Sequence, residues 1–97
     1  MHEIFKTARF DTWLRKLRDR HAVARIDRLA VGNLGDVKPV GSGISEMRID
    51  YGPGYRVYFM RQGTVIIVLL CGGDKTTQQI DIQEAKKLAA AWERQND

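Results

Sequence analysis

Two segments near the start of the chain repeat apolar residues at three- and four-residue steps. The apolar positions are Phe10, Trp13, Leu14 and Leu17 in the first segment, and Ala22, Val23, Ile26, Leu29 and Ala30 in the second. This spacing is typical of an amphipathic helix, and Thr7 is a suitable N-cap for the first one. The pattern predicts two antiparallel helices joined by a short turn, which form a helical hairpin.

After Gly35 the pattern changes from that of a helix to that of strands. Alternating residues predict strands at 44–50 and 55–61, and a continuous apolar run at 64–71 predicts a central strand covered on both faces. Residues 2–6 and 36–40 are shorter strand candidates, and Pro39 restricts the second to a sheet edge or a loop. A capping box of Asp81 and Glu84 predicts the start of a final helix.

The predicted order of elements is β-α-α-β-β-β-β-α, within a single domain that spans residues 1–97. Because the helices lie at the two ends of the chain and the strands follow one another between them, the order indicates an α+β fold. We expect an N-terminal helical hairpin packed on an antiparallel β-sheet, with a C-terminal helix and all helices on one side of the sheet.

The register of the hairpin formed by 44–50 and 55–61 decides which side chains share a face. A three-residue loop at 52–54 pairs Met47 with Phe59, Ile49 with Val57 and Asp50 with Arg56. One face is then apolar, whereas the other carries Glu46, Arg48, Asp50, Arg56 and Tyr58.

Two interpretations of this charged face stay open. It is either a solvated surface, on which each cross-strand ion pair contributes about 0.2–1 kcal/mol, or a phosphate site. In the second interpretation the guanidinium groups of Arg48 and Arg56 bind phosphate oxygens, and Tyr58 stacks on a base or donates a hydrogen bond.

Composition narrows the class of protein. The chain has 97 residues and a formal net charge of +4, from 16 Lys and Arg against 12 Asp and Glu. Its longest apolar run is far shorter than the about 20 residues of a membrane span. Cys71 is the single cysteine, the two histidines stand apart from it, and the N-terminus has no signal-peptide pattern. We expect a cytoplasmic protein that needs neither metal nor cofactor and does not enter a membrane.

Several sequence blocks, spread over nearly the whole chain, occur in the same order in a known family. They are W-L-R-K-L at 13–17, G-N-L-G-D at 32–36 with K-P-V at 38–40, S-E-M-R-I at 45–49, Y-G-P-G-Y-R-V-Y at 51–58 and L-C-G-G-D-K at 70–75. In these blocks the sequence resembles the RelE/ParE superfamily of bacterial toxins. More narrowly, it is similar to the HigB-like addiction module killer proteins of type II toxin–antitoxin systems.

This resemblance implies a ribosome-dependent mRNA endoribonuclease. Such toxins enter the ribosomal A site, where the 2′-hydroxyl of the mRNA attacks the adjacent phosphorus without a metal ion. The implied partners are a small helix-turn-helix antitoxin and the ribosome with its mRNA. Promoter DNA is expected to be bound only through the antitoxin.

The resemblance also implies roles for individual residues. Arg56 stabilises the charge that develops on the phosphate, Arg48 has a similar role or contacts a phosphate, and Lys75 supplies a further cation. Glu46 is either the general base or a charge partner of Arg48 or Lys75. The wider substrate-binding set comprises Tyr58, Lys38, Asp81, Arg15 and Lys16, the last two as contacts to ribosomal RNA.

One departure from the family leaves the activity open. Several ribonuclease members carry a tyrosine or histidine in the segment that here runs over 76–81, and this chain has neither there. Asp81 or Asp74 is the candidate substitute for the missing acid. Two alternatives therefore remain, a ParE-like toxin that inhibits DNA gyrase without enzymatic activity, and a basic module that binds RNA or protein.

Overall fold

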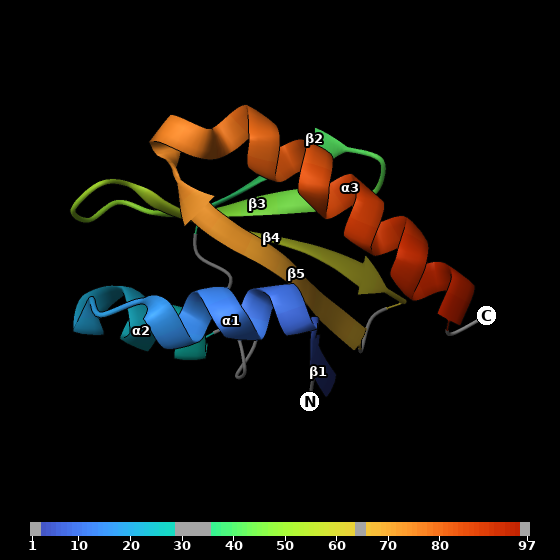
Figure 1. Ribbon diagram of the computed structural model, residues 1–97, viewed down its shortest axis with the longest axis horizontal. Coiled ribbons are helices and arrows are strands. Elements are labelled where there is room, and N and C mark those ends of the chain that lie inside the picture. Colours follow the sequence, from blue (N-terminus) through green and yellow to red (C-terminus); the bar gives the residue numbers. More distant parts are fainter. Residues whose placement is uncertain (1–2, 29–35, 64–65, 96–97) are drawn as a thin grey trace.

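A five-stranded sheet in the order β1-β5-β4-β3-β2 forms the centre of the molecule (Figure 1). The computed structural model describes residues 3–28, 36–63 and 66–95. The strands are β1 (Glu3–Lys6), β2 (Val37–Gly41), β3 (Ile44–Ile49), β4 (Tyr55–Gln62) and β5 (Ile66–Asp74). The helices are α1 (Ala8–Lys16), α2 (Arg20–Asp27) and α3 (Gln78–Gln95), the last preceded by a 3₁₀ turn, η2 (Lys75–Thr77).

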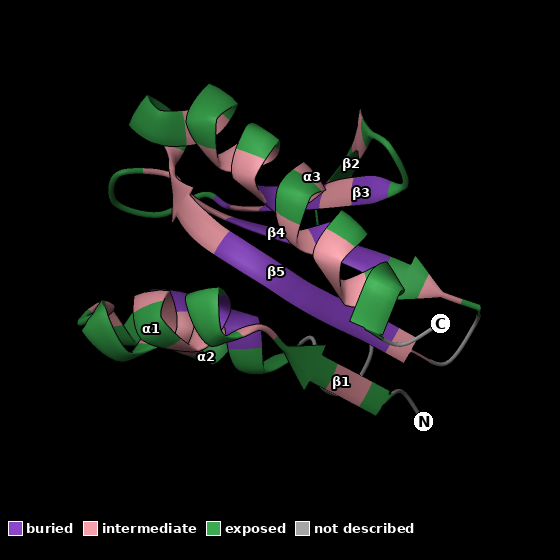
Figure 2. Cartoon of the chain, turned by 45° about the vertical axis from the view of Figure 1, so that its right-hand side comes forward, coloured by how far each residue is buried: buried purple, intermediate pink, exposed green. Residues whose placement is uncertain are grey.

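The sheet is mixed, so the predicted antiparallel sheet is wrong. β2, β3, β4 and β5 pair antiparallel, but β1 pairs parallel with β5, with Glu3 opposite Ile66 and Lys6 opposite Leu69. The cause is the apolar β5, which is buried from Ile67 to Cys71 and needs a neighbour on each edge (Figure 2). All the elements between β1 and β5 serve as the long crossover that a parallel pair requires.

Helices cover both faces of the sheet, whereas the sequence predicted them on one side. One core joins Phe10 of α1 and Ala22 and Ile26 of α2 to one face of the sheet, and the other core joins Ala85 and Ala89 of α3 to the opposite face. The alternation of side chains in β4 and β5 leaves both faces apolar, so a single layer of helices would expose one of them.

The two N-terminal helices are short, and the sheet supplies most of the core. α1 has nine residues and α2 has eight, and together they bury completely only Phe10, Ala22 and Ile26. The prediction of a helical hairpin packed on a sheet, as in the RelE/ParE fold, is therefore wrong. The last positions of the predicted second helix, Leu29 and Ala30, lie outside the described residues.

The β3–β4 hairpin keeps the predicted faces but not the predicted register. Arg48 lies opposite Arg56 and Ile49 lies opposite Tyr55, so the loop spans 50–54 instead of 52–54. The amide of Gly54 closes this loop by donating a hydrogen bond to the carbonyl of Tyr51 (3.2 Å). Because the register differs by an even number of residues, each side chain still points to its predicted face. Asp50, however, belongs to the loop and does not pair with Arg56.

The final helix begins at Gln78, earlier than the predicted start at Asp81. Asp74 caps the preceding turn η2, since its Oδ1 accepts a hydrogen bond from the amide of Thr76 (2.9 Å). Asp81 consequently lies within the first turn of α3. Among the helices of the described ranges, none is long and apolar enough to cross a membrane.

Candidate functional site

A groove of about 350 Å³ opens where the β3–β4 loop meets the end of β5, on the left in Figure 1. Its charged lining comprises Arg48 of β3, Arg56 of β4, Lys75 of η2, and the carboxylates of Asp36 and Asp50. We call it the cationic groove, because its lining contains three cationic side chains and two carboxylates. Three of the four residues predicted as catalytic thus line this groove, and the fourth, Glu46, contacts two of them.

Arg48 and Arg56 lie directly opposite each other on neighbouring strands. Like charges in this position repel each other, so the pair needs a compensating negative charge. Glu46 provides it from beneath the groove. Arg48 Nε donates a hydrogen bond to Glu46 Oε1 (3.0 Å), and Arg56 Nε lies 3.9 Å from the same oxygen. One carboxylate therefore balances the charge of both guanidinium groups, and it orients Arg48 by a hydrogen bond.

Glu46 is the single charged residue buried among the described residues, with an exposed fraction of 0%. Its second oxygen, Oε2, accepts a hydrogen bond from Gln78 Nε2 (2.9 Å), at the start of α3. Burial by itself would raise the pKa of this carboxyl. The hydrogen bonds from Arg48 and Gln78 and the charges of both arginines outweigh burial, so the pKa of Glu46 is lowered.

Arg56 retains unused hydrogen-bonding capacity. Its side chain is 16% exposed and lines the cationic groove. Two of its nitrogens, Nε and Nη1, are buried and have no hydrogen-bond acceptor among the described residues. The 3.9 Å ion pair with Glu46 is too long to count as a hydrogen bond. Buried donors are normally satisfied, so this guanidinium group keeps much of its positive charge uncompensated, and its exposed part can bind an anion in the groove.

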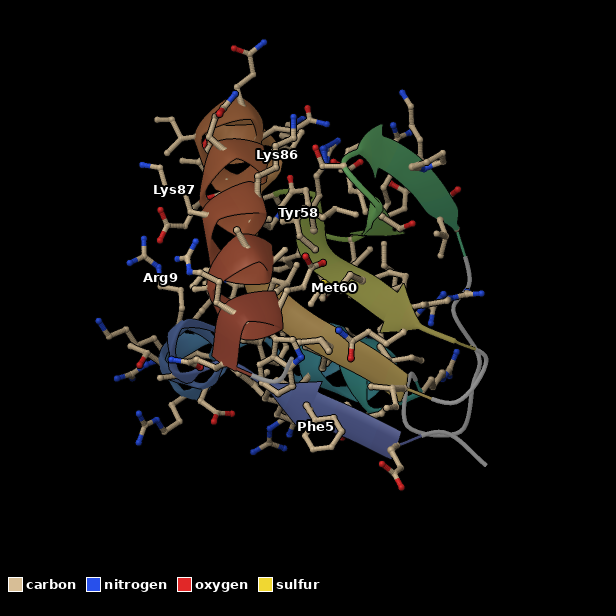
Figure 3. All side chains as sticks on the ribbon, turned by 90° about the vertical axis from the view of Figure 1, so that its right-hand side faces the viewer. Phe5, Arg9, Tyr58, Met60, Lys86 and Lys87 are labelled. Carbon is tan, nitrogen blue, oxygen red and sulfur yellow. The ribbon has the colours of Figure 1, made fainter. Side chains whose placement is uncertain are left out.

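Tyr58 lies beneath the helix rather than on a surface. Figure 3 shows it with Met60 between the sheet and α3, and its exposed fraction is 0%. A base therefore cannot reach its ring. Burial, together with the charges of Glu46 and Asp81, raises the pKa of Tyr58 well above its usual value, so the side chain remains a neutral phenol next to the Glu46 carboxylate.

The other predicted substrate-binding residues lie outside the groove. Lys38 is exposed on β2, opposite Glu46 in the strand register. Asp81 accepts a hydrogen bond from Thr77 Oγ1 (2.6 Å) beside Gly73, and burial raises the pKa of its carboxyl. Arg15 and Lys16 are exposed on α1, which packs on the face of the sheet opposite α3. The fold does not join these last two to the groove.

Gln78, Asp36 and Tyr55 are the site residues that the sequence did not indicate. Gln78 is 32 positions from Glu46 along the chain, and a glutamine at a helix start carries no local signal of such a partner. Asp36 and Tyr55 line the groove only because β2, β3 and β4 are neighbours. In the part of the chain that the structure describes, no group of three or more His, Cys, Asp or Glu residues is placed to hold a metal ion.

Comparison with known proteins identifies the family. Residues 10–94 match the model of the phage-derived Gp49-like protein family (DUF891). An uncharacterised protein of Haemophilus influenzae is 54% identical over 91 residues, which cover 90% of this chain and 92% of that protein. The chain thus belongs to the phage-derived Gp49-like family, and this membership is compatible with a toxin of a toxin–antitoxin system.

Proposed function

We propose that the protein is the toxin of a type II toxin–antitoxin system and acts as a ribosome-dependent mRNA endoribonuclease. Membership of the Gp49-like family supports the first part of the proposal. The HigB-like sequence blocks and the cations of the groove support the second. The ribosome as target means that the protein acts in the cytoplasm.

The observation that carries the proposal is the pairing of Arg48 with Arg56 across two strands. If these two positions served only the stability of the sheet, opposite charges would be expected there, because like charges that face each other across two strands are destabilising. Here two guanidinium groups are held together by one buried carboxylate at the wall of a groove. Guanidinium groups match the geometry of phosphate oxygens, so a phosphodiester is the ligand that fits this arrangement best.

The residues of the groove suit the cleavage of RNA by its own 2′-hydroxyl. Attack of the 2′-oxygen on the phosphorus forms a 2′,3′-cyclic phosphate and breaks the bond to the 5′-oxygen, which leaves and takes a proton from water. Arg48, Arg56 and Lys75 electrostatically stabilise the negative charge that develops on the non-bridging oxygens. Both oxygens of Glu46 already accept hydrogen bonds, so Glu46 acts as the charge partner that positions the arginines and not as the general base. Asp36 and Asp50 line the groove, and in this proposal one of their carboxylates accepts the proton of the 2′-hydroxyl.

Expression of the protein in bacterial cells tests the proposal. We expect growth arrest, with mRNA cut at positions phased to the reading frame, which primer extension detects. Arg56→Ala should lower the cleavage rate by about 10²-fold or more, as the loss of one preorganised donor does elsewhere. Arg61→Ala is the matched control, because Arg61 lies on the same strand but is exposed at its far end.

Two outcomes would contradict the proposal. Intact mRNA together with DNA breakage would instead indicate a toxin that acts on gyrase. Unchanged cleavage by the Arg56→Ala protein would mean that the cationic groove is not the active site.

The proposal includes a specific partner. A small helix-turn-helix antitoxin should be encoded beside this gene, neutralise the toxin and connect it to promoter DNA. Co-expression of the neighbouring reading frame should restore growth and co-purify with the protein. A neighbouring frame that neither restores growth nor binds the protein would remove the toxin–antitoxin assignment.

A further inference from the structure

A second pocket, of about 310 Å³, lies next to the cationic groove between α2 and the β3–β4 loop. Ile49 and Asp50 line both cavities, so the two are adjacent across the start of the loop. Its lining also includes His21, Arg25 and Arg28 of the α2 region and Tyr51 of the loop. We call this cavity the aromatic pocket.

An aromatic pair forms one wall of the pocket. The rings of His21 and Tyr51 have centroids 4.6 Å apart and planes 33° apart. Tyr51 is 47% exposed, whereas most large apolar side chains of the described residues are buried. An exposed ring costs free energy when no ligand covers it, and this one is placed at a pocket beside a cluster of cations.

Hydrogen bonds fix the backbone that carries each ring. Asp19 caps α2, because its Oδ1 accepts hydrogen bonds from the amides of His21 (3.0 Å) and Ala22 (3.3 Å). The amide of Tyr51 donates to the carbonyl of Ile49 (2.8 Å), and its carbonyl accepts from the amide of Gly54 (3.2 Å). The backbone on each side of the pocket is therefore ordered before any ligand arrives, which lowers the entropic cost of binding.

The charges around the aromatic pair favour an anionic ligand with a flat ring. Arg25 and Arg28 belong to the pocket lining, together with one acidic residue, Asp50, so the cationic residues outnumber the anionic one. Stacking on aromatic rings, combined with nearby cations that contact the phosphate, is the way in which proteins recognise single-stranded RNA. The volume is at the lower end of the range for small-molecule sites, which suits one base and not a folded domain.

We propose that the aromatic pocket binds one nucleobase of single-stranded RNA while an adjoining phosphate of the same strand lies in the cationic groove. This inference rests on the proposed function, since it takes the groove to be a phosphodiester site. It adds a base-binding subsite at Tyr51 and His21, so the protein contacts the nucleotide next to the scissile phosphate as well as the phosphate itself.

Binding of a 2′-O-methyl trinucleotide to the purified protein tests the inference, because a methylated 2′-oxygen prevents cleavage. We expect the ring signals of Tyr51 and His21 to shift in NMR spectra as the trinucleotide is added. Tyr51→Leu should weaken binding by about 5- to 150-fold, as the loss of one base–aromatic stack does, and Tyr51→Phe should retain it. Inorganic phosphate should still shift the Arg48 and Arg56 signals equally in wild type and Tyr51→Leu.

Phe5→Leu is the matched control, because Phe5 is also an exposed aromatic residue (40%) but contacts Trp92. Phe5 belongs to β1 at one edge of the sheet, whereas Ile49 of the pocket belongs to β3, which two strands separate from β1. Equal affinity of wild type and Tyr51→Leu would overturn the inference, as would a wild-type protein that does not bind the trinucleotide. Neither result would contradict the proposed function, because the cleavage of mRNA in cells is measured separately. Conversely, base binding at Tyr51 without any cleavage of mRNA would overturn the proposed function, but it would support the assignment of the aromatic pocket as a base-binding site.

Discussion

At the scale of single residues, the site depends on one buried carboxylate. Glu46 is 0% exposed, whereas its ion-pair partners Arg48 and Arg56 are 38% and 16% exposed. The carboxylate is thus enclosed while the guanidinium groups extend toward the groove. Removing one partner of a buried ion pair leaves an uncompensated charge, which is strongly destabilising. Glu46 therefore couples the stability of the fold to the geometry of the site.

Glu46→Gln should lower the free energy of unfolding by about 3 kcal/mol at neutral pH. Because the pKa of Glu46 is lower in the folded protein than its ordinary value near 4.5, its stabilising effect is complete above that pH. The effect is lost as the pH falls through the folded-state pKa. Urea unfolding of wild type and Glu46→Gln should therefore show a stability difference that is constant above about pH 4.5 and shrinks below it.

Glu84→Gln is the control for this measurement. Among the described residues, Glu84 forms only a long surface pair with Arg9 (3.9 Å), and such pairs contribute little to stability. We therefore expect almost no change in the free energy of unfolding, at neutral or at acidic pH. A stability difference for Glu46→Gln that persists unchanged in acid would mean that its carboxylate is not the ionised partner of the arginines.

At the scale of elements, an irregularity in β5 places the site relative to α3. The pairing of β4 with β5 shifts register between Tyr58 and Phe59, as a β-bulge does. Leu70 and Cys71 consequently both belong to the core beneath α3. The next two residues, Gly72 and Gly73, then face opposite layers, Gly72 toward α1 and Gly73 toward the first turn of α3.

Replacing each glycine by alanine should separate the roles of the two layers. A Cβ on Gly72 would lie 2.5 Å from the ring of Trp13, so Gly72→Ala should destabilise the fold by about 1–3 kcal/mol. A Cβ on Gly73 would meet the carboxylate of Asp81 and the hydroxyl of Thr77, both of which are the ends of side chains that can move aside. Gly73→Ala should therefore cost less stability but shift the start of α3, which carries Gln78, and reduce activity.

Thermal unfolding and the cleavage assay check this pair of variants. Gly72→Ala should show the larger drop in melting temperature, and Gly73→Ala the larger loss of activity for each unit of lost stability. The opposite ranking would show that the first turn of α3 does not position the groove.

At the scale of the whole molecule, the net charge of +4 is small, and its distribution matters more than its size. Arg48, Arg56 and Lys75 meet at one groove, whereas Lys86 and Lys87 lie on different sides of α3 (Figure 3). Counter-ions released from RNA phosphates make binding depend on salt in proportion to the number of phosphate contacts. Salt dependence therefore measures how many cations the groove contributes.

Binding of a short 2′-O-methyl oligouridylate should fall with salt, with a log–log slope of about −2 for three contacts to a single strand. Arg48→Ala should reduce the magnitude of this slope by about 0.7. Lys87→Ala should leave it unchanged, because Lys87 is exposed on α3 away from the groove. A slope that changes equally in both variants would indicate diffuse attraction to the surface and no defined groove. Fluorescence polarisation at several salt concentrations gives the slopes.

Local pattern in the sequence determined the elements and the faces of their side chains. Several of these predictions are confirmed: the strands β3, β4 and β5 and the N-cap at Thr7. The structure also confirms that Glu46, Arg48 and Arg56 share one face. Each of these depends on alternation or on hydrogen bonds between residues close in the chain. The motifs also indicated the cations of the groove, and their roles stay predictions.

Only the tertiary structure decided how these elements combine. Three features join residues far apart in the sequence: the parallel pairing of β1 with β5, the helices on both faces, and the contact of Gln78 with Glu46. The register of the β3–β4 hairpin was likewise decided only by the fold. Periodicity states which face a side chain takes, but not which strand becomes its neighbour. The choice of neighbour is made by the burial of apolar area over the whole molecule, so the sequence by itself indicated the charged residues, and the fold assembled them into a site.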